Sequence, residues 1–125
     1  MADNIIKLVV LLKKNPGITD EAFRAYYEST HCKLVRLVPR VERYFRRYLK
    51  SLDAPLPDGE TAVQVITELW FRNQADFDFA MAEAASPEVR SIIAADEERL
   101  FDCAAIRTYV IVEEGHSDLA IDMPS

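Results

Sequence analysis

The sequence of 125 residues contains only three glycines, two cysteines and two histidines. Three scattered glycines form no glycine-rich phosphate loop, which excludes a nucleotide-binding fingerprint. Cys32 and Cys103 form no Cys-x-x-Cys motif, and a domain of this size needs no disulfide scaffold. We therefore expect reduced thiols and a cytoplasmic location. His31 and His116 belong to no closely spaced ligand pair such as His-x-x-x-His, so we expect no metal site.

Net positive charge is also lacking, because 15 Lys and Arg residues stand against 21 Asp and Glu residues, a formal charge of −6. This balance argues against a nucleic-acid or anionic-membrane partner, either of which requires a basic patch. The apolar run at residues 5–12 is too short to span a membrane and no small-residue cleavage site follows it, so we expect a strand there.

The hydrophobic half of the sequence is arranged as strands and helices of a single domain. The first strand, residues 5–12, stops at the turn signal Asn15-Pro16-Gly17. Thr19 then caps a helix whose apolar residues recur at three- and four-residue steps until Pro39 ends it. Strand-like runs follow at 41–49 and 62–71, separated by a Pro- and Gly-containing loop at 54–59.

Two helix starts and a last strand complete the order of elements. Asn73 can cap one helix, and Ser86 followed by Pro87 begins another. The final strand covers residues 106–112. The resulting order β-α-β-β-α-β predicts an α+β, ferredoxin-like fold with an antiparallel four-stranded sheet over residues 5–113. Residues 114–125 form a polar C-terminal tail.

One side of this sheet is predicted to carry aromatic and charged side chains. Because side chains alternate along a strand, Tyr44, Arg46 and Tyr48 share one face, and Glu68 and Trp70 share another. Placed together, such groups are unusual on an open surface. Two sheets packed face to face would enclose a small-molecule cavity, or the polar groups would pair with each other at a dimer interface. Periodicity leaves both alternatives open.

His31 and Tyr44 are the two candidate catalytic residues. A histidine titrates near neutral pH and can move protons in either direction, and His31 follows Tyr27 by one helical turn. The alternative for His31 is a structural histidine held by a backbone carbonyl. Tyr44 can donate a hydrogen bond to a developing enolate or phenolate, or it is an ordinary strand aromatic.

Other chemistry-bearing residues have simpler explanations. Glu68 is either a second acid/base or, as we favour, the ion-pair partner of Arg46. Cys32 is badly placed to use His31 as a base, since adjacent helical residues do not face each other. Three carboxylates in and near the last helix are expected to be mostly solvated: Asp96, Glu97 and Asp102.

Several motifs in order resemble the EthD domain family. They are Phe23-x-x-Tyr26-Tyr27-x-x-x-His31, Glu68-Leu69-Trp70-Phe71, Ser86-Pro87-Glu88-Val89-Arg90 and Asp96-Glu97-x-x-x-Phe101-Asp102. The pattern is also similar to the methylmuconolactone methylisomerase family, whose helix histidine and strand tyrosine correspond to His31 and Tyr44. The resemblance implies a homodimeric α/β barrel with a pocket between each helical layer and its sheet.

These residues, together with the resemblance, predict a cofactor-independent lyase or isomerase that acts on an aromatic-derived or polyketide-like small molecule. Dehydration, decarboxylation and lactone isomerisation all need a proton moved beside a stabilised anion. Arg46 would anchor a substrate carboxylate, and the other predicted pocket residues are Phe23, Tyr27, Tyr48, Glu68 and Trp70. The alternative is a non-catalytic dimer that binds a small molecule or assists a degradation or biosynthetic pathway.

Overall fold

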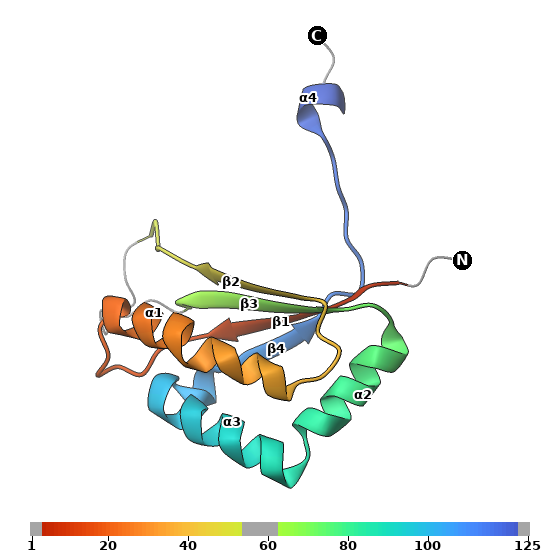
Figure 1. The fold of residues 1–125 in the computed structure, drawn as a ribbon. Coiled ribbons are helices and arrows are strands. Elements are labelled where there is room, and N and C mark those ends of the chain that lie inside the picture. The colour runs from red at the N-terminus through yellow and green to blue at the C-terminus, as the bar shows by residue number, and fades with distance from the viewer. Residues whose placement is uncertain (1–3, 54–62, 123–125) are drawn as a thin grey trace.

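The computed structural model describes residues 4–53 and 63–122, which form one antiparallel sheet with helices packed on one face (Figure 1). The strands are β1 (Ile6–Leu12), β2 (Arg43–Tyr48), β3 (Val65–Phe71) and β4 (Arg107–Val110). The helices are α1 (Asp20–Ser29), α2 (Gln74–Ala84), α3 (Pro87–Leu100) and α4 (Leu119–Asp122), with short 3-10 helices η1 (His31–Leu37) and η2 (Cys103–Ala105). Among the described helices, none has the length and apolar character needed to cross a membrane.

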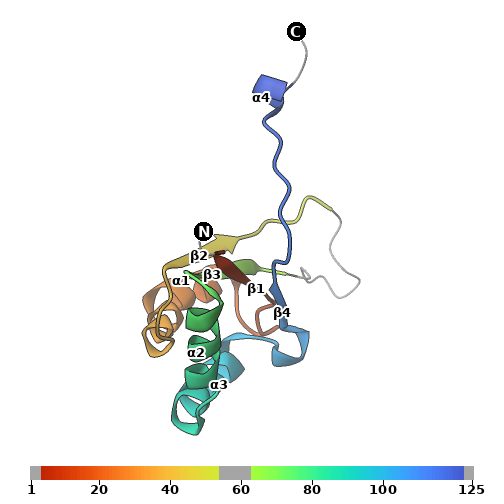
Figure 2. The ribbon, with the colours of Figure 1, turned by 90° about the vertical axis from the view of Figure 1, so that its right-hand side faces the viewer.

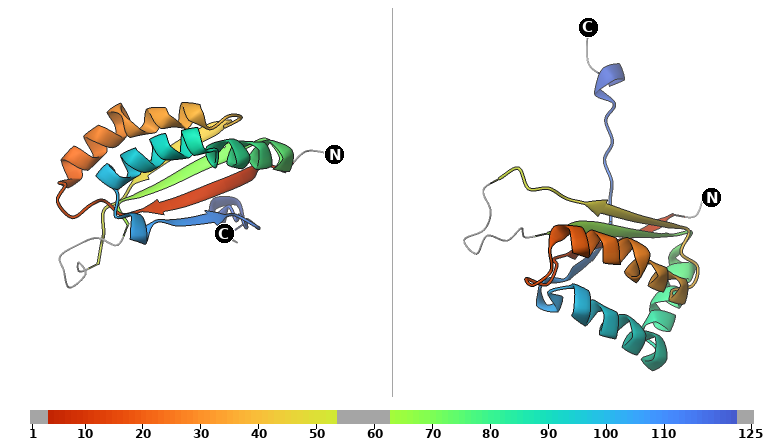
Figure 3. Two further views of the ribbon diagram at one scale, coloured as in Figure 1. Left: turned by 90° about the horizontal axis from the view of Figure 1, so that it is seen from below. Right: turned by 60° about the vertical axis from the view of Figure 1, so that its left-hand side comes forward.

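The strand order β2-β3-β1-β4 confirms the predicted ferredoxin-like α+β topology. The central strand β1 pairs antiparallel with β3 on one side and β4 on the other, and β2 pairs antiparallel with β3. The two crossovers carry α1 and the α2–α3 pair over the same face of the sheet (Figure 2). As a result α1 and α3 lie next to each other against the sheet (Figure 3, left).

The predicted helix starts are confirmed. The hydroxyl oxygen of Thr19 accepts a hydrogen bond from the Ala22 amide at 3.1 Å, and the side-chain oxygen of Asn73 accepts one from the Asp76 amide at 2.8 Å. Helix α3 begins at Pro87, directly after Ser86. Proline at this position loses no hydrogen bond, because the first amides of a helix have no partner within it.

The first helix ends nine residues earlier than its apolar pattern predicts, at Ser29 rather than Val38, because the backbone breaks at Thr30. Thr30 has φ −128° and ψ −60°, and its amide still donates to the Tyr26 carbonyl at 2.9 Å. Adjacent Ser and Thr side chains compete for backbone hydrogen bonds and weaken a helix interior. The chain continues as the tighter helix η1, so His31 lies at the break and not within a continuous helix.

Each strand is one to three residues shorter than predicted, and the predicted tail includes the short helix α4. The predicted loop at 54–59 and the first residue of the predicted third strand, residue 62, lie outside the described residues. Beyond β4 the chain leads away from the domain to α4 (Figure 1). Near the base of this segment the Lys7 ammonium pairs with the Glu114 carboxylate at 2.7 Å.

The core lies between the sheet and the helices and has two clusters. One joins Leu12 and Val65 of the sheet to Phe23 and Tyr27 of α1 and to residues at the end of α3. The other joins Leu8 and Phe71 to Ala80 of α2. Residues of both clusters, among them Leu8 and Leu12, line a cavity under the sheet.

Candidate active site

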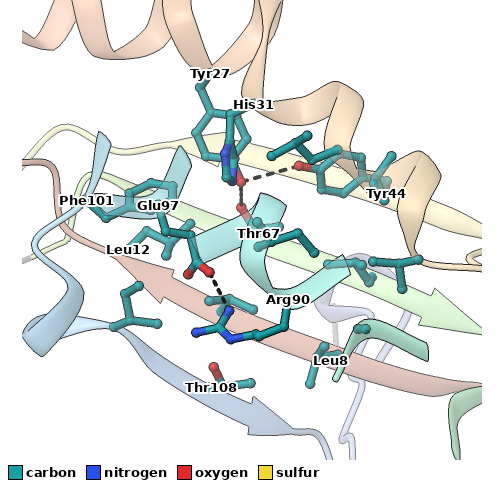
Figure 4. Close-up of a pocket in the computed structure, with 18 of the residues that line it drawn as sticks. Leu8, Leu12, Tyr27, His31, Tyr44, Thr67, Arg90, Glu97, Phe101 and Thr108 are labelled. Atoms are coloured by element: carbon teal, nitrogen blue, oxygen red, sulfur yellow. Dashed lines mark hydrogen bonds and ion pairs between the residues drawn. The ribbon is translucent and has the colours of Figure 1, made fainter. Parts of the chain in front are cut away.

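A cavity of about 270 Å³ lies between the sheet and the helical layer (Figure 4). This is close to the lower end of the ~300–1,000 Å³ range of small-molecule sites. Most of its wall is aliphatic and comes from β1, η1, β3 and α3. The polar side chains on the wall are Tyr27, His31, Tyr44, Thr67, Arg90, Glu97 and Thr108. An apolar pocket with a few converging polar groups is the usual composition of a site that binds a small organic molecule.

His31 has one polar and two aromatic partners in this wall. Its Nδ1 lies 2.6 Å from Oδ2 of Asp96, and both side chains are nearly buried, with exposed fractions of 12% and 13%. The imidazole packs edge-on against the rings of Tyr27 and Phe101, with centroid separations of 4.9 and 5.0 Å. Because Asp96 engages Nδ1, Nε2 is the ring nitrogen that can meet a ligand.

Asp96 is the residue of the candidate site that the sequence reasoning missed, because solvated surface was expected there. Its second oxygen accepts a hydrogen bond from the Tyr26 hydroxyl, and this bond raises the pKa of Tyr26. A signal was present in the sequence: Asp96 lies three residues after Ile93 and four before Leu100, which places it on the buried stripe of α3. A carboxylate there needs a partner, and His31 and Tyr26 provide two.

A chain of hydroxyl groups lines the cavity beside His31. The Tyr27 hydroxyl and Oγ1 of Thr67 are 2.6 Å apart, and the Tyr44 hydroxyl donates to the Tyr27 oxygen at 3.4 Å. Burial raises the pKa of both phenols, and the neighbouring Tyr27 adds to the large rise at Tyr44. Tyr44 is therefore protonated across the physiological pH range and can act as a hydrogen-bond donor.

Three of the residues predicted from sequence line this cavity: His31, Tyr44 and Tyr27. Phe23 lies outside it, 1% exposed, and supports the wall by packing against the rings of Tyr27 and Phe101 at centroid distances of 6.0 and 5.8 Å. The remaining predicted pocket residues, from β2 and β3, lie elsewhere.

Arg46 and Tyr48 share one partner, Glu28 of α1. Nε and Nη2 of Arg46 donate to its two carboxylate oxygens at 2.9 and 2.7 Å, and the Tyr48 hydroxyl donates to one of them. The Arg46 hydrogen bonds, with a smaller contribution from Tyr48, lower the pKa of Glu28 to about 2 against the opposing effect of burial. Arg46 is thus already neutralised within the protein.

Glu68 and Trp70 lie on the opposite face of the sheet, away from the helices. The prediction that Glu68 pairs with Arg46 is wrong, because the register places Phe45 opposite Glu68 and Arg46 opposite Thr67. Glu68 instead pairs with Arg47 and accepts a hydrogen bond from the Trp70 indole at 3.0 Å. The expected grouping of Tyr44, Tyr48, Glu68 and Trp70 on one face is therefore wrong as well.

The described residues contain no group of three or more His, Cys, Asp or Glu side chains arranged to hold a metal ion. Both cysteines are free thiols, and Cys32 donates to the Glu28 carbonyl at 2.9 Å. The cytoplasmic location expected from the cysteines stays a prediction.

The chain is similar to known proteins in both sequence and fold. The EthD domain model matches residues 15–104. A crystal structure of an EthD family protein from Bacillus halodurans is 16% identical, with a TM-score of 0.61, and covers 89% of this chain and 100% of its own. A dimeric ferredoxin-like protein of unknown function from Thermobifida fusca is 16% identical, with a TM-score of 0.57 and coverage of 87% and 91%.

SnoaB, a cofactor-independent oxygenase from Streptomyces nogalater, is 12% identical, with a TM-score of 0.54 and coverage of 90% and 95%. Identities this low establish the shared fold alone. No curated protein matches the chain. The EthD model, however, spans nearly three quarters of the sequence and includes most of the residues that line the cavity. The chain belongs to the EthD domain family.

Proposed function

We propose that this protein is a cofactor-independent lyase or isomerase that acts on an aromatic-derived or polyketide-like small molecule within the cavity. The observation that carries the proposal is the His31–Asp96 pair, held at 2.6 Å in an otherwise largely apolar wall beside the Tyr44–Tyr27–Thr67 hydroxyl chain. A proton acceptor next to a hydrogen-bond donor is the minimum needed to form and stabilise an enolate.

The residues have distinct roles in such a reaction. Nε2 of His31 takes a proton from a carbon next to a carbonyl group, and the C–H electron pair moves onto the carbonyl oxygen. Tyr44 turns its hydroxyl proton away from the long 3.4 Å bond to Tyr27 and donates it to that oxygen as its negative charge develops. Asp96 accepts from Nδ1 and stabilises the imidazolium that forms.

Three reactions use these same groups: two start from this enolate, and the third reaches an enolate by another route. In a dehydration, the hydroxyl group on the next carbon leaves as water with the proton from His31. In an isomerisation, His31 returns the proton to a different carbon. In a decarboxylation, the carboxylate carbon leaves as carbon dioxide, its electrons produce the enolate, and His31 in its protonated form supplies the proton to carbon.

A panel of small aromatic and polyketide-like ketones, acids and lactones, incubated without added cofactor, tests the proposal. We expect wild type to convert at least one class of compound. Substitution Ala84→Phe fills the cavity from α2, and we expect kcat/KM for that compound to fall by about tenfold or more, because extra volume in a packed site displaces the ligand.

The matched control is Ala82→Phe, an exposed position on the same helix. It should leave kcat/KM within about twofold of wild type, as is usual for surface changes. If wild type binds members of the panel in this cavity but converts none of them, the alternative of a non-catalytic binding or accessory protein replaces the proposed activity.

We also propose that a second copy of the chain covers the open face of the sheet, which gives a homodimer. This face carries Val9, Ile66, Phe45 and Trp70, and the Lys7 ammonium lies 4.1 Å from the Trp70 ring centroid. Aromatic and aliphatic groups mixed with paired charges are typical of protein interfaces. The segment that ends in α4 leaves the domain on this side and carries exposed Val112 and Leu119 (Figure 1).

Light scattering coupled to size exclusion tests the dimer. Wild type is expected to have twice the chain mass of 14.3 kDa. Val9→Lys places a long charged side chain in the middle of the open face, beside the Glu68–Arg47 pair, and should give the monomer mass, because removing a charge from water at an interface is costly. Ala95→Lys, on the exposed side of α3, should remain dimeric. A monomeric wild type would contradict the dimer proposal.

A further inference from the structure

Arg90 of α3 is the one Lys or Arg side chain among the described residues that line the cavity. Its Nη1 donates to Oε1 of Glu97 at 2.7 Å, two helical turns further along α3. In Figure 4 the guanidinium reaches from α3 toward Glu97, with His31 and Tyr44 on the other side of the cavity. A guanidinium has five N–H donors in a planar fork, and this contact engages a single nitrogen.

Arg90 lies in the wall of a cavity that is otherwise mostly aliphatic, and its side chain is 59% exposed. A planar fork recognises a carboxylate through two parallel hydrogen bonds. Arg46 is the arginine first expected to bind a substrate carboxylate. It is unavailable for this role because its Nε and Nη2 both donate to Glu28. With a formal charge of −6, the protein as a whole repels small anions, so an anionic ligand requires a local cation such as Arg90.

We propose that the substrates are small carboxylic acids with an apolar body, and that Arg90 binds their carboxylate and sets specificity. This rests on the proposed function of the cavity. Glu97 holds the guanidinium in place in the empty site, and the ligand carboxylate takes up the free edge of the fork. Arg90 precedes Asp96 by six residues, or ~9 Å along the helix axis, so a carboxylate on Arg90 leaves the apolar body between it and His31.

The Arg90–Glu97 ion pair gives Glu97 a part in carboxylate binding as well. Its side chain is 17% exposed while that of Arg90 is 59% exposed, so Glu97 is the fixed member and Arg90 the one that can move. Without a ligand, the Arg90–Glu97 pair has no net charge and forms a polar edge of the apolar cavity. With a carboxylate bound, one guanidinium is shared between two carboxylates, so Glu97 weakens acid binding and limits its strength.

Calorimetry with cinnamate and cinnamamide tests this inference, because the two probes have the same shape and differ in charge. We expect wild type to bind cinnamate about tenfold more tightly than the amide, as a charge-assisted bidentate contact outweighs a neutral one. Arg90→Met should remove this preference while leaving the Kd of cinnamamide within about twofold. Arg90→Lys, which keeps the charge but loses the fork, should lie between the two.

Two further variants sharpen the test. Glu97→Gln removes the competing carboxylate and should tighten cinnamate binding but not cinnamamide binding. Arg24→Met makes the same charge change at an exposed position on α1 and should leave the preference intact. Equal binding of both probes by wild type, or an unchanged preference in folded Arg90→Met, overturns the inference. Because binding alone is measured, a protein that prefers the acid yet converts nothing contradicts the proposed activity and not the role of Arg90.

Discussion

Replacement of His31 by glutamine is expected to lower kcat/KM by about a hundredfold or more, the usual contribution of one positioned acid/base group. Glutamine keeps a side-chain amide that can donate to Asp96, so the Asp96 carboxylate is not left buried without a partner. The glutamine side chain, unlike histidine, cannot take up or release a proton near neutral pH. The loss should therefore appear in turnover with the protein still folded, as followed by thermal melting of the same samples.

The second histidine of the chain offers a matched control. His116 is exposed in the segment between β4 and α4, and His116→Gln should leave kcat/KM within about twofold of wild type. If His31→Gln retains full turnover, or loses it only because it melts at a much lower temperature, His31 is a structural histidine and the acid/base assignment fails.

Asp96→Asn is expected to have the second largest effect, a loss of about a hundredfold in kcat/KM, because Asp96 is the positioning residue of His31. The amide can present its NH2 group to Nδ1, which selects the tautomer with the proton on Nε2 and leaves His31 unable to accept one there. It also removes the negative charge that stabilises an imidazolium. Asp96→Glu, which restores the carboxylate, should recover part of the activity.

Two measurements separate positioning from folding for Asp96. The proton on Nδ1 should give a downfield signal in the NMR spectrum of wild type, and this signal should be lost in Asp96→Asn. Tyr26→Phe removes the other hydrogen bond to Asp96 and should lower kcat/KM by less than about tenfold, since Asp96 keeps its charge and its contact with His31. If Tyr26→Phe and Asp96→Asn lose activity equally, Asp96 acts through packing.

The sequence was sufficient to predict the order of the strands and helices because strong local signals mark it. Asn15-Pro16-Gly17 closes β1, Thr19 and Asn73 cap their helices through side-chain hydrogen bonds, and Pro87 begins α3. Each signal acts within a few residues, so it is readable without knowledge of tertiary structure. Four strands interleaved with such helices then leave few possible topologies.

The site was less predictable because it depends on contacts between distant residues. Asp96 and His31 are 65 positions apart, and the periodicity of α3 places a carboxylate on its buried stripe without naming its partner. Alternation within β2 and β3 does not fix which face of one strand adjoins which face of the next. The pairing register does so, and it separates Arg46 from Glu68. The break at Thr30 also overrode a continuous apolar pattern.

The most direct test of the central claim is exchange of carbon-bound hydrogen in deuterated water, using cofactor-free protein and a carbonyl compound that binds the cavity. The account predicts that wild type incorporates deuterium beside the carbonyl group at a rate far above that of buffer, with and without oxygen, and that His31→Gln does not. Binding without exchange would contradict it and favour a binding protein. Conversion that requires oxygen, with no exchange in its absence, would favour oxygenase chemistry instead.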